Sequence, residues 1–519
     1  MKKHIIIATF ALASALIFSV SCAKQEVSVL ENENNPEISF FTAAIDQGYT
    51  KTVLAESYTI LRSKVIWETT DKISIAGSEY SVSSVRTDPT KAIFSGTGAT
   101  KEDGKYRAIY PSSLYKADHF ELPSVQTYAA GKFNAPMYAE SETESLAFKN
   151  ICGVLCFSLK GSSTDKVRYI TVIAKNEGVC GKFTMSDATT LKLSNKTDPV
   201  EYSRAVSLDC GSSGVALSST ATDFYIYLPQ NTYTPGMKFI ITTTENKVFE
   251  KITTVDAKID RNNIYTFDRT PEFKEKPLLL NGEFMVNEAP YKTVKFTRGN
   301  LWADASGENA SNPVLHFETN QWESNPASDS DDWSVDSSHV SHFTWSSSVK
   351  EAVDTTNYGD YLFCDEDHKL TVDGQEGCYV LNELDWWYVF TKMLGSEYGL
   401  ATVNNVNGLI ILSTGFCEPY AGVKAFISST IPVGWTANQY SAPEWIVMES
   451  EGAVFLPAAG YRFESSNVIS VNGSGYYWSS PDYDESNAWR LNFRGSGVDP
   501  GHEAPRNYGY SVRLVVDVE

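Results

Sequence analysis

Alternating apolar and polar positions run through much of the chain, and they predict many short strands. Before residue 270, segments rich in branched and aromatic side chains are each bounded by turn residues. We expect strands at residues 37–43, 64–67, 72–76, 106–110, 154–159, 169–174, 224–228, 239–244 and 264–267. No long segment before residue 270 has the period of a helix. Short strands at this spacing are typical of β-sandwiches.

The same alternation is clearest between residues 473 and 515, where it predicts strands with one hidden and one displayed face. We expect the hidden face to contain Trp478, Trp489, Leu491, Phe493, Val512 and Leu514. Asp482, Tyr483, Asp484, Asn487, Arg490, Asn492, Arg494, Asp499, His502 and Arg506 form the expected ligand-contacting set, in which Asp482 and Asp484 are secondary. Tyr, Asn and Arg suit a contact surface because they combine large area with adaptable hydrogen bonding. An ordinary surface loop is the alternative for each of them.

Tryptophan is distributed unevenly and divides the chain. Of eleven Trp residues, only Trp67 precedes residue 280. The charged, proline-bracketed segment 271–280 has the character of a linker. We therefore expect a mainly β N-terminal part, which a second boundary near Asn150 divides, and a C-terminal domain over residues 281–519.

The N-terminus resembles an export signal. Lys2 and Lys3 precede an apolar stretch over residues 5–20, and Ser21 stands before Cys22. This order predicts a lipoprotein signal peptide over residues 1–21 and a lipidated Cys22. An ordinary signal peptide cleaved nearby is the alternative. Both interpretations predict a protein outside the cytoplasm.

The charge balance limits the partners. The chain has 43 Lys and Arg against 64 Asp and Glu, a formal net charge of −21. Nucleic acids and anionic lipid surfaces attract positive surfaces, so we expect neither to be a partner. Membrane attachment would then depend on the lipid at Cys22.

The seven cysteines outside the signal region do not reveal the type of scaffold, but their odd number leaves at least one unpaired. Cys152 and Cys156 lie in an apolar run and are expected to be buried thiols. Cys364 and Cys378 are the pair whose spacing best suits a disulfide bond, but the sequence does not establish the bond.

The sequence contains no convincing catalytic or metal-binding motif. His339 and His342 have a spacing that can bind a metal, but no further ligand completes a zinc set. Residues 329–332 begin like a calcium loop without its later Gly and Glu. No nucleophile elbow, phosphate loop or zinc-protease motif occurs. We expect no cofactor, no metal and no enzymatic activity.

Segments of the C-terminal part resemble C-type-lectin-fold proteins whose variable region is diversified by retroelements. The resemblance is carried by residues 284–286, 294–301, 321–322, 398–412, 455–462, 475–480 and 508–515. It implies an α+β lectin-like domain that binds a ligand through its variable face. Residues 417–420, Cys-Glu-Pro-Tyr, depart from the calcium-dependent sugar motif, so such binding is not implied. Formylglycine-generating enzymes share this fold, but no Cys follows Cys417.

The N-terminal part resembles the fimbrillin-like pilins of anaerobic Gram-negative bacteria. The matching segments are residues 38–40, 65–75, 106–111, 148–155, 227–230 and 259–267. The resemblance implies two tandem transthyretin-like β-sandwich domains over residues 22–150 and 151–270. It also implies assembly by donor-strand exchange, in which a protease cuts after a basic residue and removes the first strand. Arg62 and Lys51 are the candidate cleavage sites.

These observations lead to one expected function and two alternatives. At about 3.3 Å per residue, the four residues after Val515 extend only roughly 13 Å, so the chain should accept a strand yet hardly donate one. We expect an outer-membrane lipoprotein at a pilus tip whose partners are pilin subunits and a protein or glycan ligand. A lipoprotein that captures glycans for uptake is one alternative. An enzyme on the formylglycine-generating-enzyme-like fold is the other.

Overall fold

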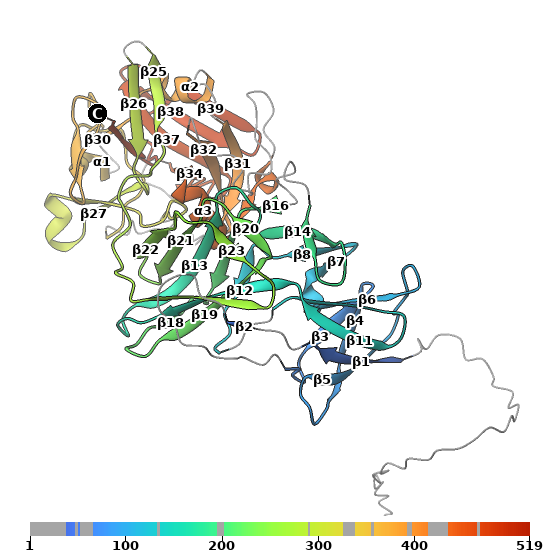
Figure 1. Ribbon diagram of the computed structural model, residues 1–519. Helices are drawn as coiled ribbons and strands as arrows, with labels where there is room; N and C mark the ends of the chain where they lie inside the picture. The colour runs from blue at the N-terminus through green and yellow to red at the C-terminus, as the bar shows by residue number, and fades with distance from the viewer. Residues whose placement is uncertain are drawn as a thin grey trace, which may run out of the picture.

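The computed structural model in Figure 1 is mainly β, and the residues that it describes include three short α-helices. It describes residues 38–46, 50–51, 66–131, 135–194, 202–288, 291–324, 338–353, 358–391, 397–413, 434–463 and 468–518. Cys22, Arg62, Cys417 and residues 329–332 lie outside these ranges. Within the ranges, no helix has the length and apolarity that a membrane crossing requires.

The N-terminal strands close into a barrel. In spatial order these are β1 (Ser39–Ile45), β11 (Ser145–Asn150), β10 (Met137–Ser141), β6 (Tyr106–Tyr110), β3 (Lys72–Ile75), β4 (Ser78–Val85) and β5 (Lys91–Gly96). Strand β1 pairs with β11 on one side and β5 on the other. Its alternating residues Phe41, Ala43 and Ile45 point into the barrel core, while Phe40 is exposed. Strand β1 therefore closes the barrel and fills part of its core.

A second group of sheets follows. One sheet has the order β19 (Thr222–Pro229), β12 (Cys152–Leu159), β24 (Asn263–Arg269) and β2 (Thr50–Lys51). Another has the order β22 (Val248–Ile252), β21 (Met237–Thr243), β13 (Lys166–Ala174), β17 (Ala205–Asp209) and β9 (Val125–Thr127), with β18 (Val215–Ala216) beside β13. Side chains from β12, β13, β19 and β21 meet in one core between these two sheets.

Smaller elements complete this part. A third sheet contains β15 (Leu191–Leu193), β14 (Cys180–Met185), β8 (His119–Leu122), β7 (Tyr115–Lys116) and β16 (Tyr202–Ser203). Strands β20 (Asn231–Tyr233) and β23 (Ala257–Ile259) form a pair, and Ser112–Leu114 form the 3-10 helix η1. Strands β8 and β9 precede residue 150, yet they pair with β14 and β17. The predicted boundary near Asn150 thus does not separate all of the strand pairing.

Eight of the nine predicted N-terminal strands coincide with β1, β3, β6, β12, β13, β19, β21 and β24. The prediction at residues 64–67 is wrong for its described part, because Ile66 and Trp67 are not in a strand. Trp67 is instead buried, with its ring edge-on to Phe94, Tyr110 and Phe148. Its apolar side chain packs in the barrel core, while its backbone is not paired with a strand.

The C-terminal part combines sheets with short helices. The first sheet has the order β25 (Phe284–Glu288), β26 (Tyr291–Phe296), β40 (Leu514–Asp517), β30 (Gln375–Val380) and β29 (Leu370–Val372). The second has the order β33 (Gln439–Tyr440), β31 (Glu397–Val403), β32 (Val406–Leu412) and β34 (Val454–Pro457). The third contains β37 (Ser474–Asp482), β38 (Asn487–Arg494) and β39 (Gly497–Pro505). Strands β27 (Leu301–Asp304) and β28 (Val314–Phe317) pair, as do β35 (Tyr461–Arg462) and β36 (Val468–Ile469). The helices are α1 (Val349–Val353), α2 (Glu383–Thr391), α3 (Ala442–Ser450), η2 (Gly307–Ser311) and η3 (Trp435–Ala437).

Arg513 is a fully buried cation at the centre of this part. Its guanidinium donates to the side chain of Asn300 at 2.8 Å and to the carbonyls of Thr297, Arg298 and Phe455 at 2.9–3.2 Å. Burial lowers the pKa of Arg513 to about 10. Because the acceptors come from distant segments, Arg513 ties the segment before β40 to the rest of the domain.

The cysteine expectations have a clear outcome. Cys152 and Cys156 are buried, as predicted, and burial raises the pKa of the Cys152 thiol. Cys364 and Cys378 are also buried, but both are free thiols.

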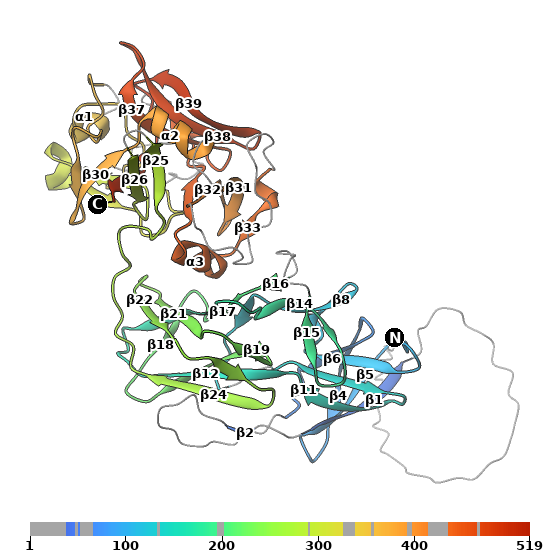
Figure 2. The same ribbon diagram turned by 45° about the horizontal axis from the view of Figure 1, so that its top comes forward.

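Helix α3 joins the C-terminal part to the second group of sheets (Figure 2). Ser441 and Glu444 form a capping box at its start. Glu444 also accepts a hydrogen bond from the Ser124 hydroxyl at 2.8 Å. Ile446 and Val447 pack against apolar side chains of β13, β17 and β21. A capped helix therefore presents its apolar residues to the sheet of another domain.

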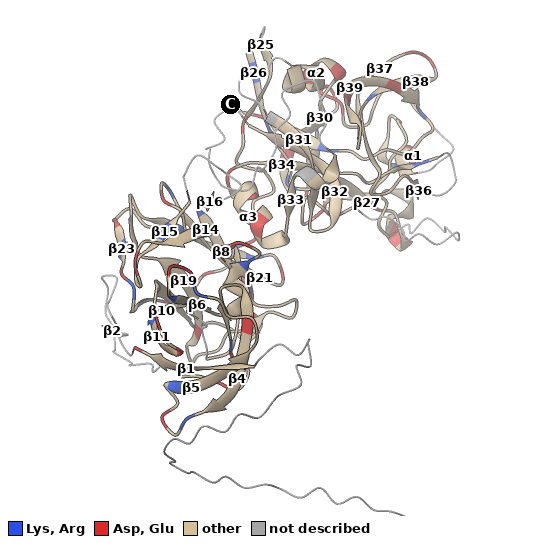
Figure 3. Cartoon of the chain, turned by 90° about the vertical axis from the view of Figure 1, so that its right-hand side faces the viewer, with Lys and Arg blue, Asp and Glu red and all other residues tan. Residues whose placement is uncertain are grey.

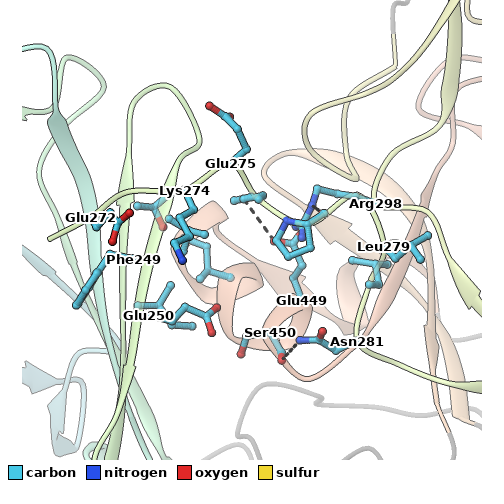
Figure 4. Close-up of a pocket in the computed structure, with 17 residues that line it drawn as sticks. Phe249, Glu250, Glu272, Lys274, Glu275, Leu279, Asn281, Arg298, Glu449 and Ser450 are labelled. Carbon is cyan, nitrogen blue, oxygen red and sulfur yellow. Dashed lines mark hydrogen bonds and ion pairs between the residues drawn. The ribbon is translucent and has the colours of Figure 1, made fainter. Parts of the chain in front are cut away.

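Glu449 stands at the end of α3 and binds the linker, as Figure 4 shows. Its carboxylate lies 2.7 Å from an Arg298 nitrogen and 3.4 Å from the Lys276 ammonium. Arg298 also donates to the carbonyl of Pro277 at 2.7 Å. A cavity of about 440 Å³ beside this cluster is bounded by β21, β22, the linker and α3. In Figure 3, acidic and basic residues are interspersed over both parts of the chain.

We predict that acid weakens this junction. Burial by itself would raise the pKa of Glu449, but the charges of Lys276 and Arg298 hold it at about 2. The pKa of Glu449 is lower in the folded protein than its usual value of 4.5, so the ionised carboxylate stabilises the fold by about 3 kcal/mol above pH 4.5. This stabilisation is lost as the pH falls to about 2. Urea unfolding between pH 5 and 2 should show a smaller loss for Glu449→Gln than for the unmodified chain. The exposed Glu308→Gln is the control, and equal pH dependence of all three proteins would contradict the assignment.

Candidate functional site

The three-stranded sheet β37–β38–β39 lies at the end of the C-terminal part that is opposite to α3 (Figure 2). Gly475 is required in β37, because a Cβ at this position would overlap the ring of Phe493 in β38. The close approach allows Tyr477, Leu491 and Phe493 to pack as one buried layer with residues of α2. One face of the sheet is therefore fixed to the core.

The strand register defines the opposite face. Tyr476, Asn492 and Asp499 are paired in one row across the three strands. Trp478, Arg490 and His502 are paired in the next row. Directly paired residues point to the same side of a sheet. Trp478 is buried beneath Tyr510, whereas the other five residues are exposed or half-buried.

Aromatic rings from neighbouring loops gather beside these rows. Tyr461 lies 4.9 Å from Tyr476 and 5.7 Å from Tyr508 between ring centroids, and Phe463 lies 5.0 Å from Tyr508. Tyr476 stacks on the buried Tyr510. Burial raises the pKa of Tyr461, which keeps its hydroxyl protonated. We call Tyr461, Phe463, Tyr476, Arg490, Asn492 and Tyr508 the tyrosine face.

Arg490 occupies the centre of this face. Its guanidinium carbon lies 4.7 Å from the ring centroid of Tyr476 and 5.2 Å from that of Tyr510. Its Nε is buried and has no hydrogen-bond partner among the described residues. Cation–π contacts to two rings hold the guanidinium without using its N–H donors. The two terminal nitrogens, which are not among the buried atoms and have no hydrogen-bond partner among the described residues, are therefore left for a group from outside the chain.

The predicted ligand contacts mostly lie at the surface. Asp482, Tyr483, Asp484, Arg494 and His502 are exposed, and Asn487, Arg490, Asn492 and Asp499 are half-buried. Asp484 accepts hydrogen bonds from the backbone N–H groups of Ser486 and Asn487, which lower its pKa. Asp484 and Asn487 thus hold the turn that contains them. As ligand contacts, all of these residues remain predictions.

Arg506 is the exception, because it is buried and points inward. It donates to the Asp482 carboxylate at 2.9 Å and to the carbonyls of Asp484, Asn487 and Gly359. Its guanidinium also lies over the Trp345 ring. The sequence pattern missed this because residue 506 lies just beyond the end of β39, where strand alternation no longer applies. Arg506 supports the turn after β37 from below and does not face a ligand.

The predicted core is correct except at one position. Trp478, Leu491, Phe493, Val512 and Leu514 are buried, as expected. Trp489 is only half-buried, and its ring meets Tyr483 edge-on at 4.8 Å. It shares a side of β38 with Leu491 but lies nearer the end of the strand.

The two histidines whose spacing could suit a metal, His339 and His342, have separate partners. His339 is 2.7 Å from the Glu318 carboxylate and stacks on Trp302. His342 is buried, and its Nε2 is 3.1 Å from the carbonyl oxygen of Ala459. Burial lowers the pKa of His342 to about 4, so the ring stays neutral at pH 7. Among the described residues, no group of three His, Cys, Asp or Glu side chains could hold a metal.

We predict different costs for two tryptophan substitutions in this sheet. Trp478→Ala should lower the free energy of unfolding by about 3 to 5 kcal/mol, because it removes a fully buried ring. Trp489→Ala should cost only about 1 to 2 kcal/mol, since its ring is already partly in water. Urea unfolding measured by circular dichroism tests the difference. Equal costs would mean that Trp489 is buried as deeply as Trp478.

Comparison with known proteins gives a local sequence match and a weak structural likeness. A family described as a domain of unknown function (DUF8237) matches residues 423–515, which contain β37, β38 and β39. No curated protein matches the chain.

Three solved structures illustrate the structural likeness. A candidate cell adhesion protein of Bacteroides ovatus is 11% identical, with a TM-score of 0.26 over 46% of this chain and 97% of that one. The tip fimbrial protein Mfa3 of Porphyromonas gingivalis, truncated at its C-terminus, is 10% identical, with a TM-score of 0.21 over 46% and 98%. A fimbrial protein of Bacteroides ovatus is 11% identical, with a TM-score of 0.21 over 92% and 98%. At such TM-scores the likeness by itself assigns neither a fold nor a function to this chain.

Proposed function

We propose that the chain is a surface adhesin that occupies the tip of a pilus and presents the tyrosine face to a ligand. The observation that carries the proposal is the position of this face, on the sheet that lies opposite to α3 and to the domains that α3 contacts (Figure 2). A ligand at the tyrosine face would not meet the rest of the chain. The N-terminal and second groups of strands would be the two fimbrillin-like domains, and the C-terminal part the lectin-like domain.

Strand β1 supports a role as acceptor of a donor strand. It is bonded on both edges and supplies three buried side chains to the barrel. Its removal would leave two open strand edges, on β5 and β11, beside an apolar groove. Lys51 follows β1 in β2, so cleavage there or at Arg62 would release β1.

Strand β40 supports the position at the tip. It lies between β26 and β30 and is paired with both. Val515 and Leu514 in this strand are fully buried. A strand that is bonded on both edges in its own domain is not available to a neighbouring subunit. In this proposal the chain is exported, attached to the outer membrane through a lipid on Cys22, and assembled with pilin subunits.

We predict that processing is required for assembly. The Lys51→Gln, Arg62→Gln double variant should retain β1 and stay out of pili, because no groove opens for the donor strand. Mass spectrometry of the N-terminus and electron microscopy with an antibody to residues 281–519 measure both steps. Lys72→Gln, which changes an exposed lysine of β3, is the control. In the unmodified protein, antibody bound along the whole shaft would contradict the tip position.

We also predict that adhesion depends on the tyrosine face. The Tyr476→Ser, Tyr508→Ser double variant should bind target cells or matrix about tenfold or more weakly, because aromatic anchors contribute much of a contact surface. Tyr291→Ser changes a tyrosine that is 70% exposed in β26, and it should leave binding unchanged. Circular dichroism and thermal unfolding check that both variants fold. Unchanged adhesion by a folded double variant would overturn the assignment of this face.

A further inference from the structure

We propose that the tyrosine face binds a saccharide that carries a carboxylate, and that Arg490 holds this carboxylate. The inference rests on the proposed function of the face and adds the chemical class of its ligand. It concerns a site without a calcium ion, in which a side-chain cation would do the recognition.

The state of Arg490 is the first argument. The guanidinium is half-buried against Tyr476 and Tyr510, and no carboxylate or carbonyl accepts its hydrogen bonds among the described residues. Arg506 and Arg513, by contrast, donate to several acceptors each. A planar guanidinium with free donors matches the two oxygens of a carboxylate in a bidentate arrangement. The rings fix its plane before the ligand arrives, which reduces the entropy lost on binding.

The surroundings of Arg490 favour a sugar as the rest of the ligand. Tyr461, Tyr508 and Phe463 offer partly exposed rings, and such rings pack against the C–H faces of pyranose rings. Asn492 and Asp499 lie across the strands in the row that contains Tyr476. Their side chains supply donors and acceptors in short reach, as hydroxyl groups require because each hydroxyl both donates and accepts.

Other ligand classes fit less well. A peptide that extends the sheet would pair with the outer edge of β39, but Pro500 and Pro505 lack the backbone N–H groups that such pairing uses. A phosphate would bring nearly two negative charges to a face on which Asp499 already lies, in the strand row next to that of Arg490 and His502. One carboxylate matches one guanidinium in charge.

Isothermal titration of the full-length protein with matched saccharides tests the inference. The probes are a panel of uronic acid and sialic acid oligosaccharides, each paired with its methyl ester, which removes the charge and keeps the ring. At least one acid should bind about 10- to 100-fold more tightly than its ester, the range expected for a charge-assisted hydrogen bond. Arg490→Gln should remove this difference, and Arg490→Lys should restore only part of it. Arg86→Gln, an exposed arginine of the barrel end, should leave it unchanged.

Each outcome separates the inference from the proposed function. Equal binding of acid and ester, or an unchanged preference in folded Arg490→Gln, overturns the role of Arg490. Absence of binding to every saccharide overturns the ligand class, even if the tyrosine variants still lose adhesion. If the tyrosine variants adhere normally, the proposed function of the face fails instead. Circular dichroism of Arg490→Gln and Arg490→Lys ensures that a loss of binding is not a loss of fold.

Discussion

The buried carboxylate of Glu449 is the constraint on which the arrangement of the chain depends. It sits at the end of α3, between the Arg298 guanidinium and the Lys276 ammonium. Transfer of these charges out of water costs free energy that only close pairing offsets. The carboxylate therefore fixes the linker, the start of the C-terminal part and α3 relative to one another. Because α3 also packs on β13 and β17, the sheet that carries the tyrosine face is held at a defined end of the molecule.

Strands β1 and β40 differ in what their removal from the chain would cost. Strand β1 is local to the barrel and enters it from the N-terminal side, so its loss would remove a contiguous piece of core. Strand β40 instead follows Arg513, whose guanidinium is bonded to four acceptors from other segments. Withdrawal of β40 would leave a buried cation and several carbonyls without partners, which is far more costly. In the proposed pilus, this asymmetry would favour accepting a donor strand over supplying one.

Strand alternation predicted most of what depends on local pattern. It placed eight of the nine N-terminal strands and the buried Leu491 and Phe493 correctly, because each strand alternates regularly over several residues. Trp478 is also buried as expected, but on the other side of the sheet. It failed for Trp489 and Arg506, which lie near or beyond strand ends, where burial depends on the segments that pack there. The pairing of β8 and β9 with strands beyond residue 150 depends on tertiary contacts, which the local sequence pattern does not reveal.

The tyrosine face illustrates the same limit. Tyr476 could have been assigned to the outer side, since it alternates with the buried Tyr477 in β37. Tyr461 and Tyr508 carry no such signal, because they come from a two-residue strand and a turn that only the fold brings together. The sequence identified Arg490 as a surface cation, but only the structure shows that two rings fix its orientation.

The connection through Arg513 also bears on how the molecule would carry mechanical load. A pull on the distal sheet passes along the chain after β39 to Arg513, and from there to the carbonyls of Thr297 and Arg298. Arg298 in turn forms an ion pair with Glu449 and donates a hydrogen bond to the carbonyl of Pro277. In the proposed role, tension would be shared between these contacts and the pairing of β40 with β26 and β30. Under flow, Arg513, Arg298 and Glu449 would therefore contribute to the strength of attachment beside these paired strands.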